Sequence, residues 1–73
     1  MEEIQMPMNS PQIDQKNLHI LEDQLNYEAL AVKKYRQASQ FCTNPDIVNL
    51  CNEASTRHRR HFDQLLSYLN SHS

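Results

Sequence analysis

The chain has 73 residues, of which 38% are hydrophobic and 22% charged, a composition that predicts one small globular domain near the lower limit for an independent hydrophobic core. Its net charge of about −2 at pH 7 argues against nucleic acid or an anionic membrane as a partner. Because the chain contains no glycine, it lacks the glycine-rich loops that bind phosphates and dinucleotides, and it lacks the residue preferred in tight β-hairpin turns.

The sequence carries no sign of a membrane or secretory segment. No apolar run approaches the roughly 18 residues that a membrane-spanning helix needs. The first residues, MEEIQMPMNSPQ, lack the basic start and the apolar stretch of a secretory signal. We therefore expect a cytoplasmic protein, with reduced thiols and no membrane partner. Cys42 and Cys51 do not form a metal-type C-x-x-C pair, which favours small buried side chains over a redox or disulfide role.

Residues 1–12 are polar, contain two prolines and show no sustained period. This pattern predicts a flexible N-terminal arm ahead of a helical hairpin domain that covers residues 13–73. Three methionines in the arm offer apolar side chains through which it could contact a protein partner.

The first predicted helix begins after Ser10 or Asp14, either of which can cap it, and Pro11 suits the first helical position after Ser10. From Leu18 onward, apolar residues recur in steps of three and four, the spacing of one helical face. The stripe contains Leu18, Leu21, Leu25, Glu28, Val32, Tyr35, Ser39 and Cys42, widened by Ala31, Ala38 and Phe41. One member is charged: the carboxylate of Glu28 lies in the middle of this predicted core.

The sequence TNPD ends the first helix and begins a second, because Asn44 is a good N-cap and Pro45 fits the first helical position. The second stripe again follows steps of three and four. It contains Ile47, Cys51, Ala54, His58, His61, Leu65 and Tyr68, broadened by Val48, Phe62, Leu66 and Leu69. His58 and His61 interrupt this stripe, just as Glu28 interrupts the first.

The turn between the two predicted helices is so short that they must pack antiparallel. Glu28 lies sixteen residues before position 44, and the position sixteen residues after it falls between His58 and His61. The three polar residues that interrupt the stripes are therefore predicted to face one another at one height.

Glu28, His58 and His61 form a set of side chains that can bind a metal ion. The histidines are three residues apart on one helical face, so both imidazoles can reach one ion, and the glutamate adds an oxygen. Two histidines and one carboxylate occur in many zinc sites and in the facial triad that holds non-haem ferrous iron. The alternative is a polar cluster in which Glu28 accepts hydrogen bonds from one or both histidines. Tyr35, two turns away, is either a hydrogen-bond donor to the cluster or a core residue.

Two other kinds of site are disfavoured by position. The stretch RHRRH places its arginines on the outer face beside Glu53 and Asp63, without interleaved aromatic residues, which is typical of a solvated helix surface. Cys42 and Cys51 lie near the turn, too far from His58 for either to act as a nucleophile beside it. We therefore expect no nucleic-acid partner and identify no catalytic residue, and the sequence leaves open whether the protein turns over a substrate.

The stretch LNYEALAVKKYRQAS, in which Tyr35 follows Glu28 by seven residues, resembles the first ligand helix of the ferritin-like superfamily. It is most similar to rubrerythrin and to short coat-protein-like relatives of ferritin from spore-forming bacteria. The stretch NEASTRHRRHFDQLLSYL resembles the next helix of that family, which carries a Glu-x-x-His motif followed by an aromatic residue and leucines. His61 matches the family histidine, whereas His58 stands where the family has its metal-bridging glutamate. The resemblance covers residues 14–70, about half of the usual four-helix bundle.

The resemblance implies a ferritin-like fold, with carboxylate-bridged di-iron chemistry as the function of the family. His58 in place of the bridging glutamate argues against that oxidase or peroxidase chemistry. Because one hairpin leaves at least half of each stripe exposed, we expect a homodimer that completes a four-helix bundle. One expected function is binding of iron, manganese or zinc through Glu28, His58 and His61, with a redox or storage role. The other is a structural protein of spore-coat type with the same fold and no metal, which would be associated with spores.

Overall fold

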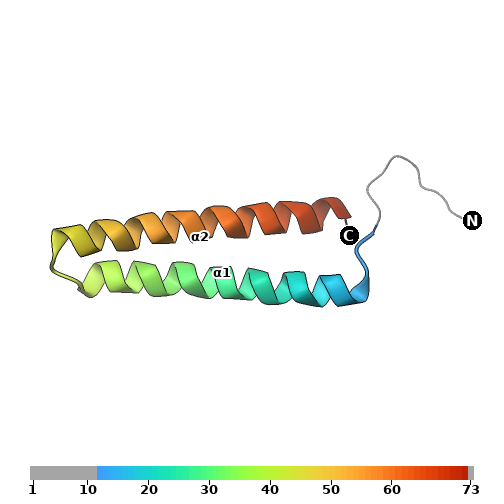
Figure 1. The fold of residues 1–73 in the computed structure, drawn as a ribbon, viewed down its shortest axis with the longest axis horizontal. Helices are drawn as coiled ribbons and strands as arrows, with labels where there is room; N and C mark the ends of the chain where they lie inside the picture. The colour runs from blue at the N-terminus through green and yellow to red at the C-terminus, as the bar shows by residue number, and fades with distance from the viewer. Residues whose placement is uncertain (1–11, 73) are drawn as a thin grey trace, which may run out of the picture.

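The computed structural model describes residues 12–72, which fold into two helices joined by a short turn. Helix α1 spans Gln15–Phe41 and helix α2 spans Pro45–His72. Figure 1 shows the helices side by side and antiparallel, with the start of α1 beside the end of α2. The predicted all-α antiparallel hairpin is therefore confirmed. Within the described residues, neither helix contains an apolar stretch that could span a membrane.

The start of α1 is held by two local interactions. Asp14 has extended backbone (φ −76°, ψ 166°), and its Oδ1 accepts a hydrogen bond from the Asn17 backbone N–H at 2.8 Å. This is the N-cap geometry that the sequence allowed at Asp14, and the other candidate, Ser10, lies outside the described residues. Just before the cap, the Ile13 N–H donates to the His72 carbonyl at 3.0 Å, which ties the start of the domain to the end of α2. The remaining residues of the predicted N-terminal arm, residues 1–11, also lie outside the described part.

The turn also has the predicted construction. The Cys42 N–H donates to the Ala38 carbonyl at 2.9 Å, and Cys42 then leaves the helix in an extended conformation. Asn44 Oδ1 accepts hydrogen bonds from the backbone N–H of Asp46 at 2.9 Å and of Ile47 at 3.2 Å. Pro45 takes the first helical position, where its missing N–H removes no helical hydrogen bond.

The helices meet along one stripe of each. In α1 the predicted stripe is correct except that Tyr35 is 38% exposed, and its buried or half-buried members are Leu18, Leu21, Leu25, Glu28, Val32, Ser39 and Cys42. In α2 the stripe consists of Val48, Cys51, Ser55, His58, Phe62, Leu65 and Leu69, and Ala54 beside it is buried as well. The prediction for α2 was wrong at four positions, which are exposed: Ile47, His61, Leu66 and Tyr68. Two neighbouring rows of α2 both carry apolar residues. The row that faces α1 contains the polar residue Ser55, so its sequence pattern looked less like a core stripe than that of the neighbouring row.

The core between the two helices is small. Among the described apolar residues, only Leu21, Leu25 and Ala54 are buried, and no large side chain is completely enclosed. The predicted core residues Ala38 and Phe41 are exposed, Phe41 by 83%. A two-helix layer therefore leaves much of the apolar surface of the chain in contact with water.

The Asn44 cap gives a direct test of the turn. Asn44→Ala removes both hydrogen bonds at the start of α2, and we expect it to lower the free energy of unfolding by about 1 kcal/mol in urea denaturation. The control is Thr43→Ala, at an exposed neighbouring position, for which we expect a change within about 0.5 kcal/mol. Equal losses from the two substitutions would contradict the capping role of Asn44.

Candidate metal centre

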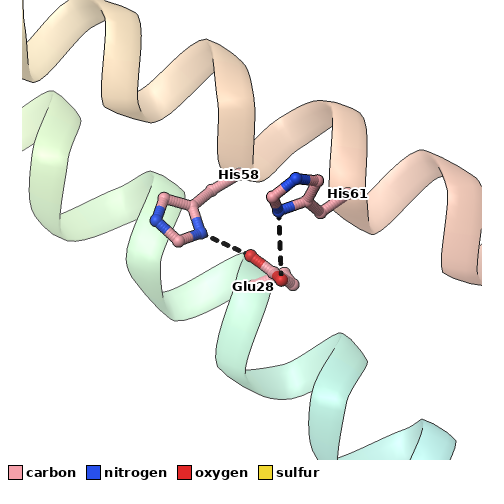
Figure 2. Close-up of side chains that lie close together, drawn as sticks. All are labelled: Glu28, His58 and His61. Atoms are coloured by element: carbon pink, nitrogen blue, oxygen red, sulfur yellow. Dashed lines mark hydrogen bonds and ion pairs between the residues drawn. The ribbon is translucent and has the colours of Figure 1, made fainter.

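The three predicted ligand side chains come together between the middle of α1 and α2. Glu28 lies on the buried stripe of α1, with 11% of its side chain exposed. His58 lies opposite on the buried stripe of α2, and His61 is one turn further along the same helix. Figure 2 shows both imidazoles projecting from α2 toward the carboxylate of Glu28. The predicted convergence of the three residues at one height is therefore confirmed.

Each oxygen of the Glu28 carboxylate faces a different imidazole. His58 Nδ1 lies 2.5 Å from Oε1, and with that nitrogen protonated it donates a hydrogen bond to the carboxylate. His61 Nδ1 lies 3.5 Å from Oε2. One potential ligand atom from each of the three residues lies within 4.8 Å of the other two. Within residues 12–72, no other group of three or more such side chains is as close together.

The donor set suits a single divalent ion. Ligand bonds of about 2.0–2.2 Å in a tetrahedral site place neighbouring donor atoms about 3.3–3.6 Å apart. The separation of 3.5 Å between His61 Nδ1 and Glu28 Oε2 matches that spacing, whereas the 2.5 Å between His58 Nδ1 and Oε1 is a hydrogen-bond distance that would have to lengthen around an ion. An ion would replace the proton between Glu28 and His58 and would require both imidazoles to be neutral. With three protein ligands, it would keep at least one position for water or another small ligand.

Two tyrosines of α1 pack around His58. The Tyr35 ring is stacked on the imidazole, with centroids 5.5 Å apart and an interplanar angle of 15°. The Tyr27 ring meets the same imidazole edge-on, at 6.1 Å and 76°. Tyr35 thus contributes its ring face to the cluster, and Tyr27 is a neighbour that the sequence reasoning missed. The sequence feature that could have indicated this contact is the position of Tyr27 directly before Glu28, beside the buried stripe. Together the two rings restrict the orientation of the His58 imidazole.

The two histidines of the cluster differ in how far solvent reaches them. The His58 side chain is 18% exposed, whereas that of His61 is 47% exposed. An open groove of about 740 Å³ extends from Glu28 and His61 toward the beginning of α1, with apolar walls that include Ile20 and Tyr68. An ion in solution could therefore reach the carboxylate from the His61 side.

The remaining candidate residues lie apart from this centre. Cys42 and Cys51 are half-buried free thiols near the turn, which agrees with the small buried side chains expected from the sequence. His19 lies in the first part of α1 and His72 at the end of α2, and neither belongs to the cluster. The candidate site therefore consists of Glu28 and two of the four histidines.

No family model matches the chain, and neither the curated proteins nor the solved structures include a significant match to it. The ferritin-like resemblance and the metal-binding role therefore stay predictions. What the site can do follows from its own side chains and their geometry.

Glu28 can be compared with a second glutamate that lies near a histidine on the same helix. Glu28→Ala leaves the His58 Nδ1 without its partner in a partly buried position, so we expect a loss of about 1–3 kcal/mol of stability. Glu22→Ala removes an exposed glutamate 3.5 Å from His19, and we expect a change within about 0.5 kcal/mol. Urea denaturation without added metal measures both. An effect of Glu28→Ala as small as that of Glu22→Ala would show that the buried contact adds nothing to stability.

Proposed function

We propose that this chain is a small ferritin-like metal-binding protein in which Glu28, His58 and His61 hold one transition-metal ion, such as iron, manganese or zinc. The observation that carries the proposal is the convergence of these three side chains on one point of an otherwise mainly apolar contact. A carboxylate and an imidazole that leave water lose favourable hydration, and a bound cation compensates for that loss. The two-histidine, one-carboxylate set is also a known donor set for zinc and for ferrous iron.

The donor set favours a single ion over a bridged pair of ions. Two hairpins would together supply two carboxylates and four imidazoles, where the ferritin-like family supplies four carboxylates and two imidazoles. With two negative charges fewer, such a site would stabilise a pair of highly charged ions less well. The proposed role is therefore storage or redox chemistry at a mononuclear site, and not di-iron oxidase activity.

The proposal includes a homodimer in which two hairpins form a four-helix bundle. The small core supports this, because a second hairpin would cover apolar side chains that one hairpin leaves in water. We place the protein in the cytoplasm, or in association with spores. The three methionines of residues 1–12 offer apolar side chains through which a protein partner could bind. The proposal requires neither nucleic acid nor a membrane.

A second candidate function is a structural protein of spore-coat type with the same fold and no metal. The observation that favours it is the direct contact between Glu28 Oε1 and His58 Nδ1 at 2.5 Å. This contact gives the buried carboxylate a hydrogen-bond donor without any ion. The two candidates differ in what a metal ion does to the stability of the protein.

The test is metal-dependent thermal unfolding of protein purified without a histidine tag. A ligand that binds only the folded state at a hundred times its Kd adds about 2.7 kcal/mol of stability. Excess ferrous iron, manganese or zinc should therefore raise the Tm of the parent, and elemental analysis should find about one ion per chain. Glu28→Ala and His61→Ala should both abolish the shift. His19→Ala, which removes an exposed histidine outside the cluster, should retain it.

The structural alternative makes the opposite prediction. In that case the Tm of the parent is indifferent to all three metals. Replacing the whole cluster by Glu28→Leu, His58→Leu and His61→Leu would then be neutral or stabilising, because well-packed apolar side chains can substitute for a buried polar group. These two results together would end the metal-binding proposal.

A further inference from the structure

Each helix carries a second row of side chains beside the buried one. Its members directly precede the residues of the predicted stripe in α1 and of the observed stripe in α2. They are Ile20, Gln24, Tyr27, Ala31, Lys34, Ala38 and Phe41 in α1, and Ile47, Leu50, Ala54, Arg57, His61, Gln64 and Tyr68 in α2. In an antiparallel pair, residues that precede the contact row lie on the same side in both helices. The groove confirms this, since its walls include Ile20 and Gln24 from α1 and His61 and Tyr68 from α2. We call this surface the His61 face.

Large exposed hydrophobic side chains gather on the His61 face. Six of the nine large hydrophobic residues that are exposed within residues 12–72 belong to it: Ile20, Tyr27, Phe41, Ile47, Leu50 and Tyr68. Leu30, which is 50% exposed, belongs to neither side of the hairpin. The opposite face, formed by the residues that directly follow the contact rows, is mainly polar and includes Lys33, Arg36, Asn52 and the ion pair of Arg59 with Asp63. Leu66 is the exposed large hydrophobic residue of that polar face, at 37%, whereas Leu50 on the His61 face is 63% exposed. The His61 face is therefore the more apolar of the two sides of the hairpin.

We infer that the His61 face is the surface on which a second copy of this chain packs, so that the partner covers the open side of the Glu28–His58–His61 cluster. The inference rests on the proposed homodimer and specifies its interface. Helices of 27 and 28 residues are about 40 Å long, and two packed helices are about 20 Å wide. The face thus measures roughly 800 Å², which equals the area that each partner contributes to a standard stable interface.

The side chains of the His61 face also suit pairing with themselves. Large residues such as Tyr27 and Leu50 share the face with the small residues Ala31 and Ala38, so two copies can interdigitate. Its two basic residues, Lys34 and Arg57, have long aliphatic side chains that can lie along apolar surface while their charged groups reach the edge of the interface. A second copy is available wherever the chain is made, and it supplies the apolar layer that the small core lacks.

This arrangement changes the environment of the candidate metal centre. His61 belongs to both the cluster and the His61 face, and nearly half of its side chain is exposed in the single hairpin. Pairing through this face would exclude water from His61 and from the groove beside Glu28. Pairing through the polar face would leave the cluster open, so the choice of face decides whether the site is enclosed.

Two leucines of α2 provide a matched test. Leu50→Lys puts a charge on the His61 face, and Leu66→Lys puts the same charge on the opposite face. By sedimentation equilibrium in the presence of a chelator, we expect the parent and Leu66→Lys to be dimers at micromolar concentration. For Leu50→Lys we expect a dimer dissociation constant at least about tenfold higher, which corresponds to a loss of about 1.4 kcal/mol.

A second measurement stays informative if Leu50→Lys fails to fold. With Cys42 and Cys51 replaced by serine, Ala38→Cys introduces a thiol on the His61 face and Ala29→Cys introduces one on the opposite face of the same helix. Both alanines are exposed in the single hairpin. In the folded dimer, a thiol reagent should modify Ala38→Cys at least about tenfold more slowly than Ala29→Cys, because only the former is covered by the partner.

The outcomes separate the choice of face from the dimer itself. A dimer that tolerates Leu50→Lys but is lost in Leu66→Lys, or that leaves Ala38→Cys fully reactive, would overturn the assignment of the His61 face. A parent chain that is a folded monomer at micromolar concentration would overturn the proposed homodimer as well. Because a chelator is present throughout, neither result depends on whether the cluster binds a metal.

Discussion

The contact of one carboxylate with two imidazoles across the helix pair is the constraint on which the rest of the structure depends. Glu28 is the buried acidic residue of a thin apolar layer, and its two oxygens face His58 and His61. A slip of one helical turn between α1 and α2 would place this carboxylate against apolar side chains, without a donor or a cation. The cluster therefore favours the same relative height of the helices that the short turn sets, in addition to forming a candidate site.

The same contact explains why the hairpin has two different sides. With His58 in the row that faces α1, His61 must lie one row to the side, together with Leu50 and Tyr68. The opposite surface then carries Lys33, Arg36 and the ion pair of Arg59 with Asp63. The orientation of α2 about its own axis thus determines both the geometry of the cluster and which surface of the hairpin is the more apolar one.

Much of the fold follows from local signals in the sequence. Asp14, Asn44 and Pro45 mark the starts of both helices, and the short turn between them enforces the antiparallel pairing. The convergence of Glu28 with the two histidines followed from counting residues on each side of the turn. Counting of this kind succeeds because a helix rises by a constant amount per residue.

The face that α2 turns toward α1 could not be predicted in the same way. Its apolar residues occupy two adjacent rows, and periodicity alone does not say which row faces α1. Ser55 is buried although it is polar, while Ile47 and Tyr68 are exposed although they are apolar. The packing of Tyr27 and Tyr35 on His58 depends on which face of α2 is turned toward α1, so the sequence did not predict it and the structure was needed to find it.

The central claim is that Glu28, His58 and His61 together bind one metal ion. The most direct measurement is long-range proton–nitrogen NMR of the histidine rings during titration with zinc, a diamagnetic ion. The account predicts that the ring nitrogens of His58 and His61 shift together and saturate at about one equivalent of zinc per chain. The signals of His19 and His72, which lie outside the cluster, should stay in place. Unchanged His58 and His61 signals, or equal responses from all four histidines, would contradict it.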